Sequence, residues 1–123
     1  MVTIGNHLKM HLPHSLRERA SCFYTEVLGC RKLNNQPYPN LDLYEFQGGF
    51  VLGLFFCDEA ETLPEREHLK ATWMEIKTDN PNTLKQRLVE FGVHEVDFED
   101  KSRFYFQAPG GQVFRLAPME GGL

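Results

Sequence analysis

The sequence has no long hydrophobic run and no block of like charge. Its longest apolar run, Phe50 to Phe56, is seven residues long and is interrupted by a glycine, whereas a membrane-spanning helix needs about 20 apolar residues. Lys and Arg number 13 against 17 Asp and Glu, which gives a net charge of −4. Because nucleic acids and anionic membrane surfaces attract basic proteins, we expect neither as a partner.

Cysteine is scarce as well. Cys22, Cys30 and Cys57 are an odd number without the spacing of a disulfide scaffold, and the first residues lack the apolar core of a signal peptide. These features favour a reducing cytoplasm as the location. The sequence places no histidine or other base beside any of the three cysteines, so we do not expect a nucleophilic thiol.

The chain has the composition of one globular domain, with 123 residues of which 41 % are hydrophobic. Its first half reads as strand, helix and three strands. Residues 4–12 alternate as in a strand, and 16–28 carry apolar residues at helical spacing. Ser15 and Glu18 have the spacing of a capping box, and Gly29 is placed to end the helix. Strands are then expected at 32–34, 41–47 and 50–57.

The same order of elements returns in the second half. Residues 71–78 alternate as in a strand, and Asn80 and Pro81 are suited to begin a helix that Gly92 ends. Three more strands are expected at 94–98, 102–107 and 112–117. Between the halves, 58–67 is charged and has no periodicity, so it is expected to be a loop.

Three landmarks relate the halves. The central residues of the first and fifth strands match at a spacing of 66 positions, the helix-ending glycines at 63, and Gly48–Leu54 matches Gly110–Leu116 at 62. Residues 1–123 are therefore predicted to form one domain with a module at about 4–57, a linker at about 58–69 and a module at about 70–118. Each half is small enough that we expect the two to pack together.

Several strands have one polar face, which is costly to bury without water. Each helix needs an apolar sheet face, so we expect the opposite faces to line a ligand cavity. By alternation, the lining consists of His7, Lys9, His11, Val51, Gly53, Phe55, Trp73, Glu75, Lys77, Tyr105, Val113 and Arg115.

Two segments resemble the vicinal oxygen chelate superfamily, which includes glyoxalase I, bleomycin- and fosfomycin-resistance proteins and extradiol dioxygenases. Cys22–Cys30 resembles the FYxxVLG helix end of that superfamily, and Phe104–Leu116 resembles its closing strand pair. The resemblance covers Ile4 to Pro118. It implies an α+β fold in which two βαβββ modules form a cup-shaped mixed sheet, usually in a homodimer that shares sites between subunits.

The metal enzymes of that superfamily place ligands on the first, fourth, fifth and eighth strands. The resemblance puts His7 or Lys9 at the first position, Gly53 at the second, Trp73 at the third and Arg115 at the fourth. Three of these four positions lack a metal donor. We therefore expect no divalent metal ion and no other cofactor.

Other histidines offer no replacement site. His7 and His11 are four strand residues apart, about 13 Å, while zinc ligands lie about 2.1 Å from the metal. His7 and Glu75 could bind one metal ion together only if their strands were neighbours. His14, His68 and His94 fall at the ends of elements and are expected to be exposed.

Three side chains keep two interpretations each. Arg115 is either an ion-pair partner of Glu75 or a clamp for a carboxylate or phosphate ligand. Trp73 is either a packed core aromatic or a stacking platform for a ligand. Glu75 is either paired with Arg115 or Lys9, or a general base.

The leading functional hypothesis is metal-free binding of a small molecule in the cup, similar in kind to the bleomycin-resistance proteins. The ligand would carry an acidic part for Arg115 and an aromatic part. One alternative is a lyase, isomerase or dioxygenase that has a non-standard metal site or no metal and uses His7 and Glu75 as acid and base. The other is a homodimer whose surface, rather than its cup, is the functional part. No catalytic residue is assigned, and the predicted ligand-binding residues are His7, Lys9, His11, Phe55, Trp73, Glu75, Tyr105 and Arg115.

Overall fold

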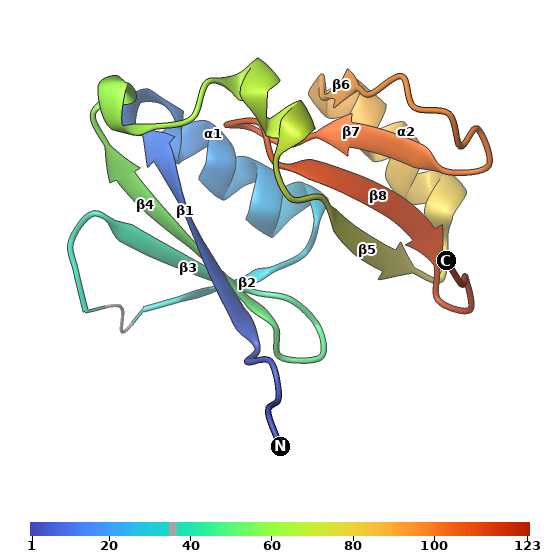
Figure 1. The fold of residues 1–123 in the computed structure, drawn as a ribbon, viewed down its shortest axis with the longest axis horizontal. Helices are drawn as coiled ribbons and strands as arrows, with labels where there is room; N and C mark the ends of the chain where they lie inside the picture. The colour runs from blue at the N-terminus through green and yellow to red at the C-terminus, as the bar shows by residue number, and fades with distance from the viewer. Residues whose placement is uncertain (35–36) are drawn as a thin grey trace. The chain divides into compact units, whose positions relative to one another are not determined.

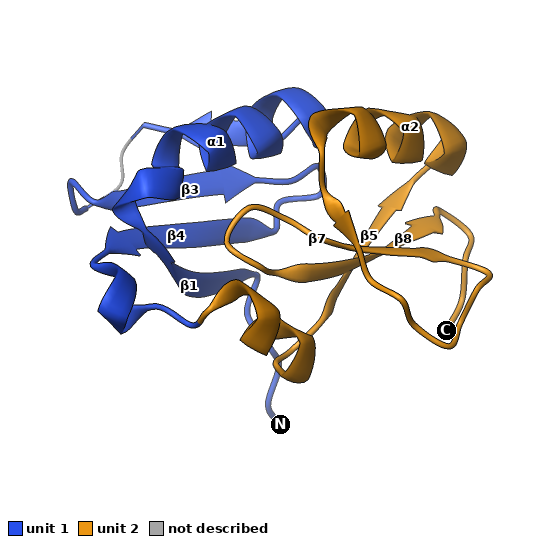
Figure 2. Cartoon of the chain, turned by 90° about the horizontal axis from the view of Figure 1, so that it is seen from above, with its two compact units in different colours: residues 1–63 blue, residues 64–123 orange. Residues whose placement is uncertain are grey.

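The structure is a computed structural model that describes residues 1–34 and 37–123. Its strands form two four-stranded sheets (Figure 1). The chain divides into two compact units, residues 1–63 and 64–123, and each contains one sheet (Figure 2). Among the described residues, every helix is too short or too polar to cross a bilayer.

Unit 1 contains a mixed sheet in the order β1-β4-β3-β2. The strand β1 runs parallel to β4, and the other pairs are antiparallel. The bounds are β1 His7–Pro13, β2 Arg31–Leu33, β3 Leu41–Glu45 and β4 Val51–Cys57. One face of this sheet packs against the helical segment through buried residues that include Leu12, Phe23, Leu52, Leu54 and Phe56.

The helical segment of unit 1 has three parts. A 3-10 turn at His14–Leu16 leads into α1, Arg17–Cys22, and a π-helical turn follows at Phe23–Val27. The predicted helix over 16–28 is confirmed, as is its end, where Gly29 has a φ of 74°. The predicted capping box is wrong. Because the 3-10 turn already contains Ser15, the residue at the start of α1 is Leu16, and no side-chain hydrogen bond caps it.

Unit 2 repeats this topology in the order β5-β8-β7-β6, with β5 parallel to β8. The bounds are β5 Met74–Thr78, α2 Pro81–Phe91, β6 His94–Glu95, β7 Phe104–Gln107 and β8 Val113–Pro118. The Asn80 side chain accepts a hydrogen bond from the Thr83 backbone N–H, and Gly92 ends α2 with a φ of 99°. The repeat of strand, helix and three strands confirms the predicted pair of βαβββ modules.

Several element bounds differ from the prediction, among them the start of the fifth strand, which is at Met74 rather than Ala71. The first strand begins at His7 rather than Ile4 because its partner β4 begins only at Val51. The strand predicted at 94–98 shortens to β6, which pairs through two residues before the chain leaves the sheet edge. The segment predicted as a loop forms short 3-10 helices at Glu59–Glu61 and Glu65–Lys70.

Candidate functional site

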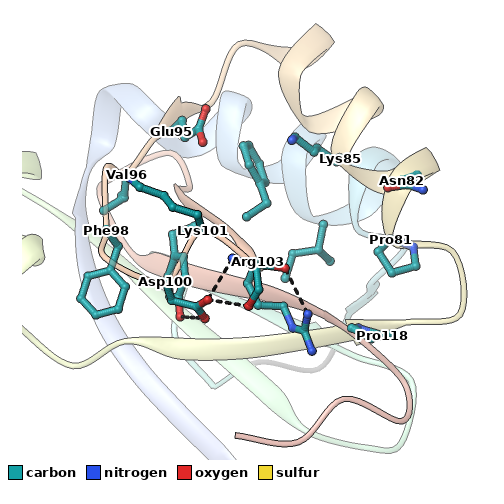
Figure 3. Close-up of a pocket in the computed structure, with 14 residues that line it drawn as sticks. Pro81, Asn82, Lys85, Glu95, Val96, Phe98, Asp100, Lys101, Arg103 and Pro118 are labelled. Carbon is teal, nitrogen blue, oxygen red and sulfur yellow. Dashed lines mark hydrogen bonds between the residues drawn. The ribbon is translucent and has the colours of Figure 1, made fainter.

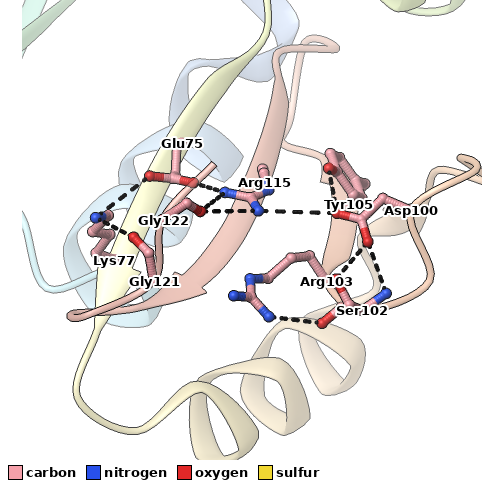
Figure 4. Close-up of polar contacts among 9 residues, drawn as sticks. All are labelled: Glu75, Lys77, Asp100, Ser102, Arg103, Tyr105, Arg115, Gly121 and Gly122. Atoms are coloured by element: carbon pink, nitrogen blue, oxygen red, sulfur yellow. Dashed lines mark hydrogen bonds and ion pairs between the residues drawn. The ribbon is translucent and has the colours of Figure 1, made fainter.

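The sheet face of unit 2 that lies opposite α2 carries a row of polar side chains across three strands. The register sets Glu75 of β5 and Tyr105 of β7 on either side of Arg115 in β8. Cross-strand partners point to the same side of a sheet, so these three side chains share one face. The structure thus brings three of the predicted site residues together (Figure 4).

An ion-pair network connects this row. The Arg115 guanidinium pairs with Glu75, and its Nη2 lies 3.9 Å from Asp100 Oδ2. The Lys77 ammonium lies 3.9 Å from Glu75 Oε1. The Arg115 side chain is only 14 % exposed. The ion-pair interpretation of Arg115 and Glu75 is therefore confirmed, with Lys77 rather than Lys9 as the additional cation.

Two groups of the network, Arg115 and Asp100, have shifted pKa values. Burial lowers the pKa of Arg115, but hydrogen bonds with Glu75 and Tyr105 outweigh burial and leave that pKa raised. Hydrogen bonds from Ser102 hold the pKa of Asp100 below its ordinary value, and Tyr105 adds to this effect. Both groups are charged at neutral pH, so the face presents fixed charges of both signs.

The C-terminal residues cover part of these cations. Lys77 Nζ donates a hydrogen bond of 2.7 Å to the Gly121 carbonyl. The two terminal nitrogens of Arg115 donate to the Gly122 carbonyl at 3.3 and 3.4 Å. Two neutral carbonyls thus receive the hydrogen bonds that a bound anion would otherwise accept (Figure 4).

An aromatic cluster, made of Trp73, Phe98 and Tyr105, adjoins the network. The ring centroid of Phe98 lies 4.9 Å from those of both Trp73 and Tyr105, and Trp73 and Tyr105 are 5.7 Å apart. Tyr105 connects the rings to the charges, because its hydroxyl donates to Asp100 Oδ2 at 3.1 Å. Trp73 is half-buried and Phe98 is 39 % exposed, so the cluster is open to solvent.

The indole nitrogen of this cluster is already used: Trp73 Nε1 donates to the Leu69 carbonyl at 3.1 Å. The ring is therefore fixed in orientation while part of it stays accessible. Trp73 thus packs against Phe98 and Tyr105 while part of its side chain stays open to solvent.

Phe98 and Asp100 were not predicted from the sequence as site residues. Phe98 was expected in a strand, and no role was predicted for Asp100. Both lie in the segment that connects β6 to β7, where side-chain alternation carries no information. The acidic and aromatic composition of 97–100 was the only signal.

In unit 1, the face opposite α1 carries a second aromatic cluster, centred on Phe55. The register places His7, Lys9 and His11 beside Val51, Gly53 and Phe55 respectively. Lys9 Nζ lies 4.9 Å from the Phe55 ring centroid, and the His11 ring stacks on Phe55 at 6.0 Å. Tyr38, which the sequence analysis did not select, lies 5.6 Å from Phe55.

The residues at the metal-ligand positions do not fit a metal ion. A Cβ built on Gly53 would lie 3.3 Å from Leu43 Cδ2 and 3.5 Å from Leu41 Cδ1, so leucines fill the space that a ligand side chain would need. Arg115 is held by Glu75 and has no lone pair to donate. Across residues 1–34 and 37–123, no three His, Cys, Asp or Glu side chains gather closely enough to hold a metal.

His7 and Glu75 belong to separate sheets, because β1 pairs with β4 and β5 pairs with β8. One expectation about the other histidines is wrong. His68 is only 7 % exposed, because the 3-10 helix Glu65–Lys70 packs it against the turn at Gly111. His14 and His94 are exposed as expected.

The cysteines have raised pKa values, which disfavour the reactive thiolate. Burial raises the pKa of Cys30 to about 12 and also raises that of Cys57. A hydrogen bond with Glu26 raises the pKa of Cys22. These directions agree with the expectation that no thiol is a nucleophile.

A cavity of about 360 Å³ lies in unit 2 between the first turns of α2, the segment before β7, the start of β7 and the end of β8 (Figure 3). Of the predicted ligand-binding residues, only Tyr105 lines it. The cavity thus shares Phe98, Asp100 and Tyr105 with the site described above, but neither Glu75 nor Arg115 lines it.

Comparison of the sequence with protein-family models and with curated proteins gives no match. Solved structures match over nearly the whole chain. The fosfomycin resistance protein FosX from Listeria monocytogenes has a TM-score of 0.73 at 12 % identity, with 94 % of this chain and 91 % of that chain covered. Leishmania major glyoxalase I has a TM-score of 0.71 at 21 % identity, with 94 % and 86 % covered.

A third similar structure is TnmS3, an antibiotic binding protein from Streptomyces sp. CB03234. Its TM-score is 0.60 at 21 % identity, and the match covers 96 % of this chain and 98 % of that chain. The chain therefore has the fold of the glyoxalase, fosfomycin-resistance and bleomycin-resistance proteins, which is the fold of the vicinal oxygen chelate superfamily. The fold that the sequence resemblance implied is confirmed.

Proposed function

We propose that the protein is a small-molecule-binding member of the vicinal oxygen chelate superfamily that holds its ligand without a metal ion. The observation that carries this proposal is the open aromatic cluster of Trp73, Phe98 and Tyr105 beside the charged row of Glu75 and Arg115. Aromatic faces next to a few fixed polar groups are typical of sites that bind small organic molecules.

The absence of a donor set at the expected metal positions supports the metal-free part. Leucines surround Gly53, and Arg115 places a positive charge where a carboxylate ligand would be needed. A cation there would repel a divalent ion rather than hold it. The similarity to an antibiotic binding protein is in keeping with a role in binding rather than in chemistry.

The contacts of the C-terminal residues support an acidic ligand. Arg115 and Lys77 donate hydrogen bonds to the carbonyls of Gly122 and Gly121, respectively. A carboxylate that replaced these carbonyls would accept the same hydrogen bonds with a full negative charge, and charge-assisted bonds are about twice as strong as neutral ones. An aromatic acid would then stack on Trp73 while its carboxylate met Arg115.

Fluorescence of Trp73, the single tryptophan of the chain, tests this function. Benzoate is titrated against the protein in parallel with benzamide, its uncharged analogue of similar shape. We expect a saturable change in emission with benzoate and binding at least tenfold weaker with benzamide. A response that does not saturate, or equal binding of the two compounds, would contradict the proposal.

The variant R115M tests the role of the guanidinium, and R31M serves as the matched control. Arg31 also forms an ion pair across a strand pair, with Glu45, but it is exposed and lies in unit 1. We expect R115M to lose the preference for benzoate over benzamide and R31M to keep it. The double variant E75Q/R115M removes both charges of the pair and separates lost binding from an unpaired Glu75.

A further inference from the structure

The cavity of unit 2 is a candidate site apart from the charged row and has an apolar floor. Phe104, Tyr105 and Leu116 are all buried and form part of its lining. Val96, Phe98, Pro81 and Pro118 add apolar side chains. A volume of about 360 Å³ is within the range of cavities that bind small organic molecules.

Two cations stand over this floor without an acidic partner. Lys85 Nζ lies 5.1 Å from the centroid of the Phe104 ring. Arg103 donates from Nη1 to the Ser102 carbonyl at 3.1 Å, while its Nε is buried and has no hydrogen-bond partner. In the part of the chain that the structure describes, neither side chain is paired with a carboxylate.

Two other charged side chains of the lining, Lys101 and Asp100, already have partners. Lys101 pairs with Asp97, and Asp100 accepts hydrogen bonds from Ser102 and Tyr105. One further carboxylate, that of Glu95, lies at the opposite end of the lining from Pro118 in Figure 3. Lys85 and Arg103 outnumber Glu95 among the lining charges without an ion-pair partner, so the charge left beside the apolar floor is net positive, in a chain whose net charge is −4.

From this arrangement we infer that the cavity is a second binding site, which takes a small organic anion with an apolar body. The apolar part lies on Phe104 and Leu116, and the anionic group is held by the Arg103 guanidinium and by the Lys85 ammonium. Phe98 and Tyr105 belong to both candidate sites, but neither cation belongs to the row of Glu75 and Arg115, so the inference rests on different charges from the proposed function.

Amide NMR spectra of the whole chain test the inference, with phenyl phosphate as the probe. We expect saturable shifts in residues 81–85 and 95–104 and much weaker binding of inorganic phosphate and of phenol, since each supplies only half of the ligand. Equal binding of inorganic phosphate and phenyl phosphate would overturn the apolar part of the inference. Shifts confined to the surroundings of Arg115 would overturn the site itself.

Charge-removing variants make the test specific. We expect K85M and R103Q each to weaken the binding of phenyl phosphate about tenfold, the factor that corresponds to 1.4 kcal/mol. K70M is the control, because Lys70 is an exposed cation paired with Glu67, and R115M is the control for the other face. Unchanged affinity in correctly folded K85M and R103Q, or a loss only in R115M, would refute the inference.

Discussion

At the scale of single residues, the clearest stabilising element is a buried acid in unit 1. Asp42 is only 1 % exposed. Its carboxylate accepts two hydrogen bonds from Arg17, at 2.7 and 3.1 Å, and lies 3.6 Å from Lys32 Nζ. Arg17 lies in α1 and Asp42 in β3, so this pair attaches the helix to the sheet.

We expect D42N to lower the free energy of unfolding at neutral pH by about 2 kcal/mol, because it leaves Arg17 and Lys32 without their anion. Burial raises the pKa of Asp42, but Arg17 and Lys32 outweigh it and leave the pKa lowered. A lowered native pKa means that the stabilisation is present above the unfolded pKa of about 3.9 and is lost as the pH falls through the native value.

Denaturant unfolding of the natural chain and of D42N at neutral pH and near pH 3 checks this account. The difference in stability between the two proteins should shrink as the pH falls, because protonated Asp42 also loses its charge. A difference that stays constant with pH would show that packing, rather than charge, is what D42N removes.

At the scale of elements, the sequence predicted the strands and helices from periodicity and from the residues that end them. Gly29 and Gly92 end helical segments in the left-handed conformation, as expected from their positions. Ser15 failed as a cap although its spacing to Glu18 was right, because Pro13 leads into a 3-10 turn that local spacing cannot reveal. The side chain of Asn80, in contrast, caps α2 as predicted.

The turn at Gly110-Gly111 shows a tertiary constraint that the matching turn at Gly48-Gly49 lacks. Both turns have positive φ values, but a Cβ on Gly111 would lie 2.6 Å from His68 Cδ2 and 2.9 Å from the Glu65 carbonyl oxygen. A Cβ on Gly48 would meet no atom within 4 Å. The first turn therefore needs glycine only for its backbone conformation. The second turn needs it for the same reason and also because Gly111 has no room for a side chain.

We expect G48A to cost about 1 kcal/mol of stability from the positive φ alone. G111A should cost about 1–3 kcal/mol more, because the 3-10 helix Glu65–Lys70 must move. Thermal unfolding of both variants measures the difference. Equal losses in G48A and G111A would contradict the packing of His68 against this turn.

At the scale of the whole molecule, the repeat was the most informative feature of the sequence. The matched glycines and strand centres predicted two βαβββ modules, and the sheets β1-β4-β3-β2 and β5-β8-β7-β6 confirm them. Three further statements remain predictions. They are that residues 1–123 form a single domain, that the protein is a homodimer and that it is located in the cytoplasm.

The candidate site could be predicted where it lies on strands or, as at Trp73, directly before one. Alternation placed Glu75, Tyr105 and Arg115 on one face, and the register confirms this row. Phe98 and Asp100 lie between strands, and the cations of the second site come from a helix and from the residue before β7. Their positions depend on how the chain crosses the sheet edge, which no periodicity encodes.

The central claim is that a protein with this fold binds its ligand without a metal ion. The most direct test is the metal content of the tag-free chain, measured by mass spectrometry after incubation with Ni²⁺, Zn²⁺, Mn²⁺ and Fe²⁺ and subsequent desalting. Because Gly53, Trp73 and Arg115 supply no donor, the account predicts that only trace metal remains on the protein. One tightly held ion per chain would contradict it and would point to an enzyme with a ligand set of a different kind.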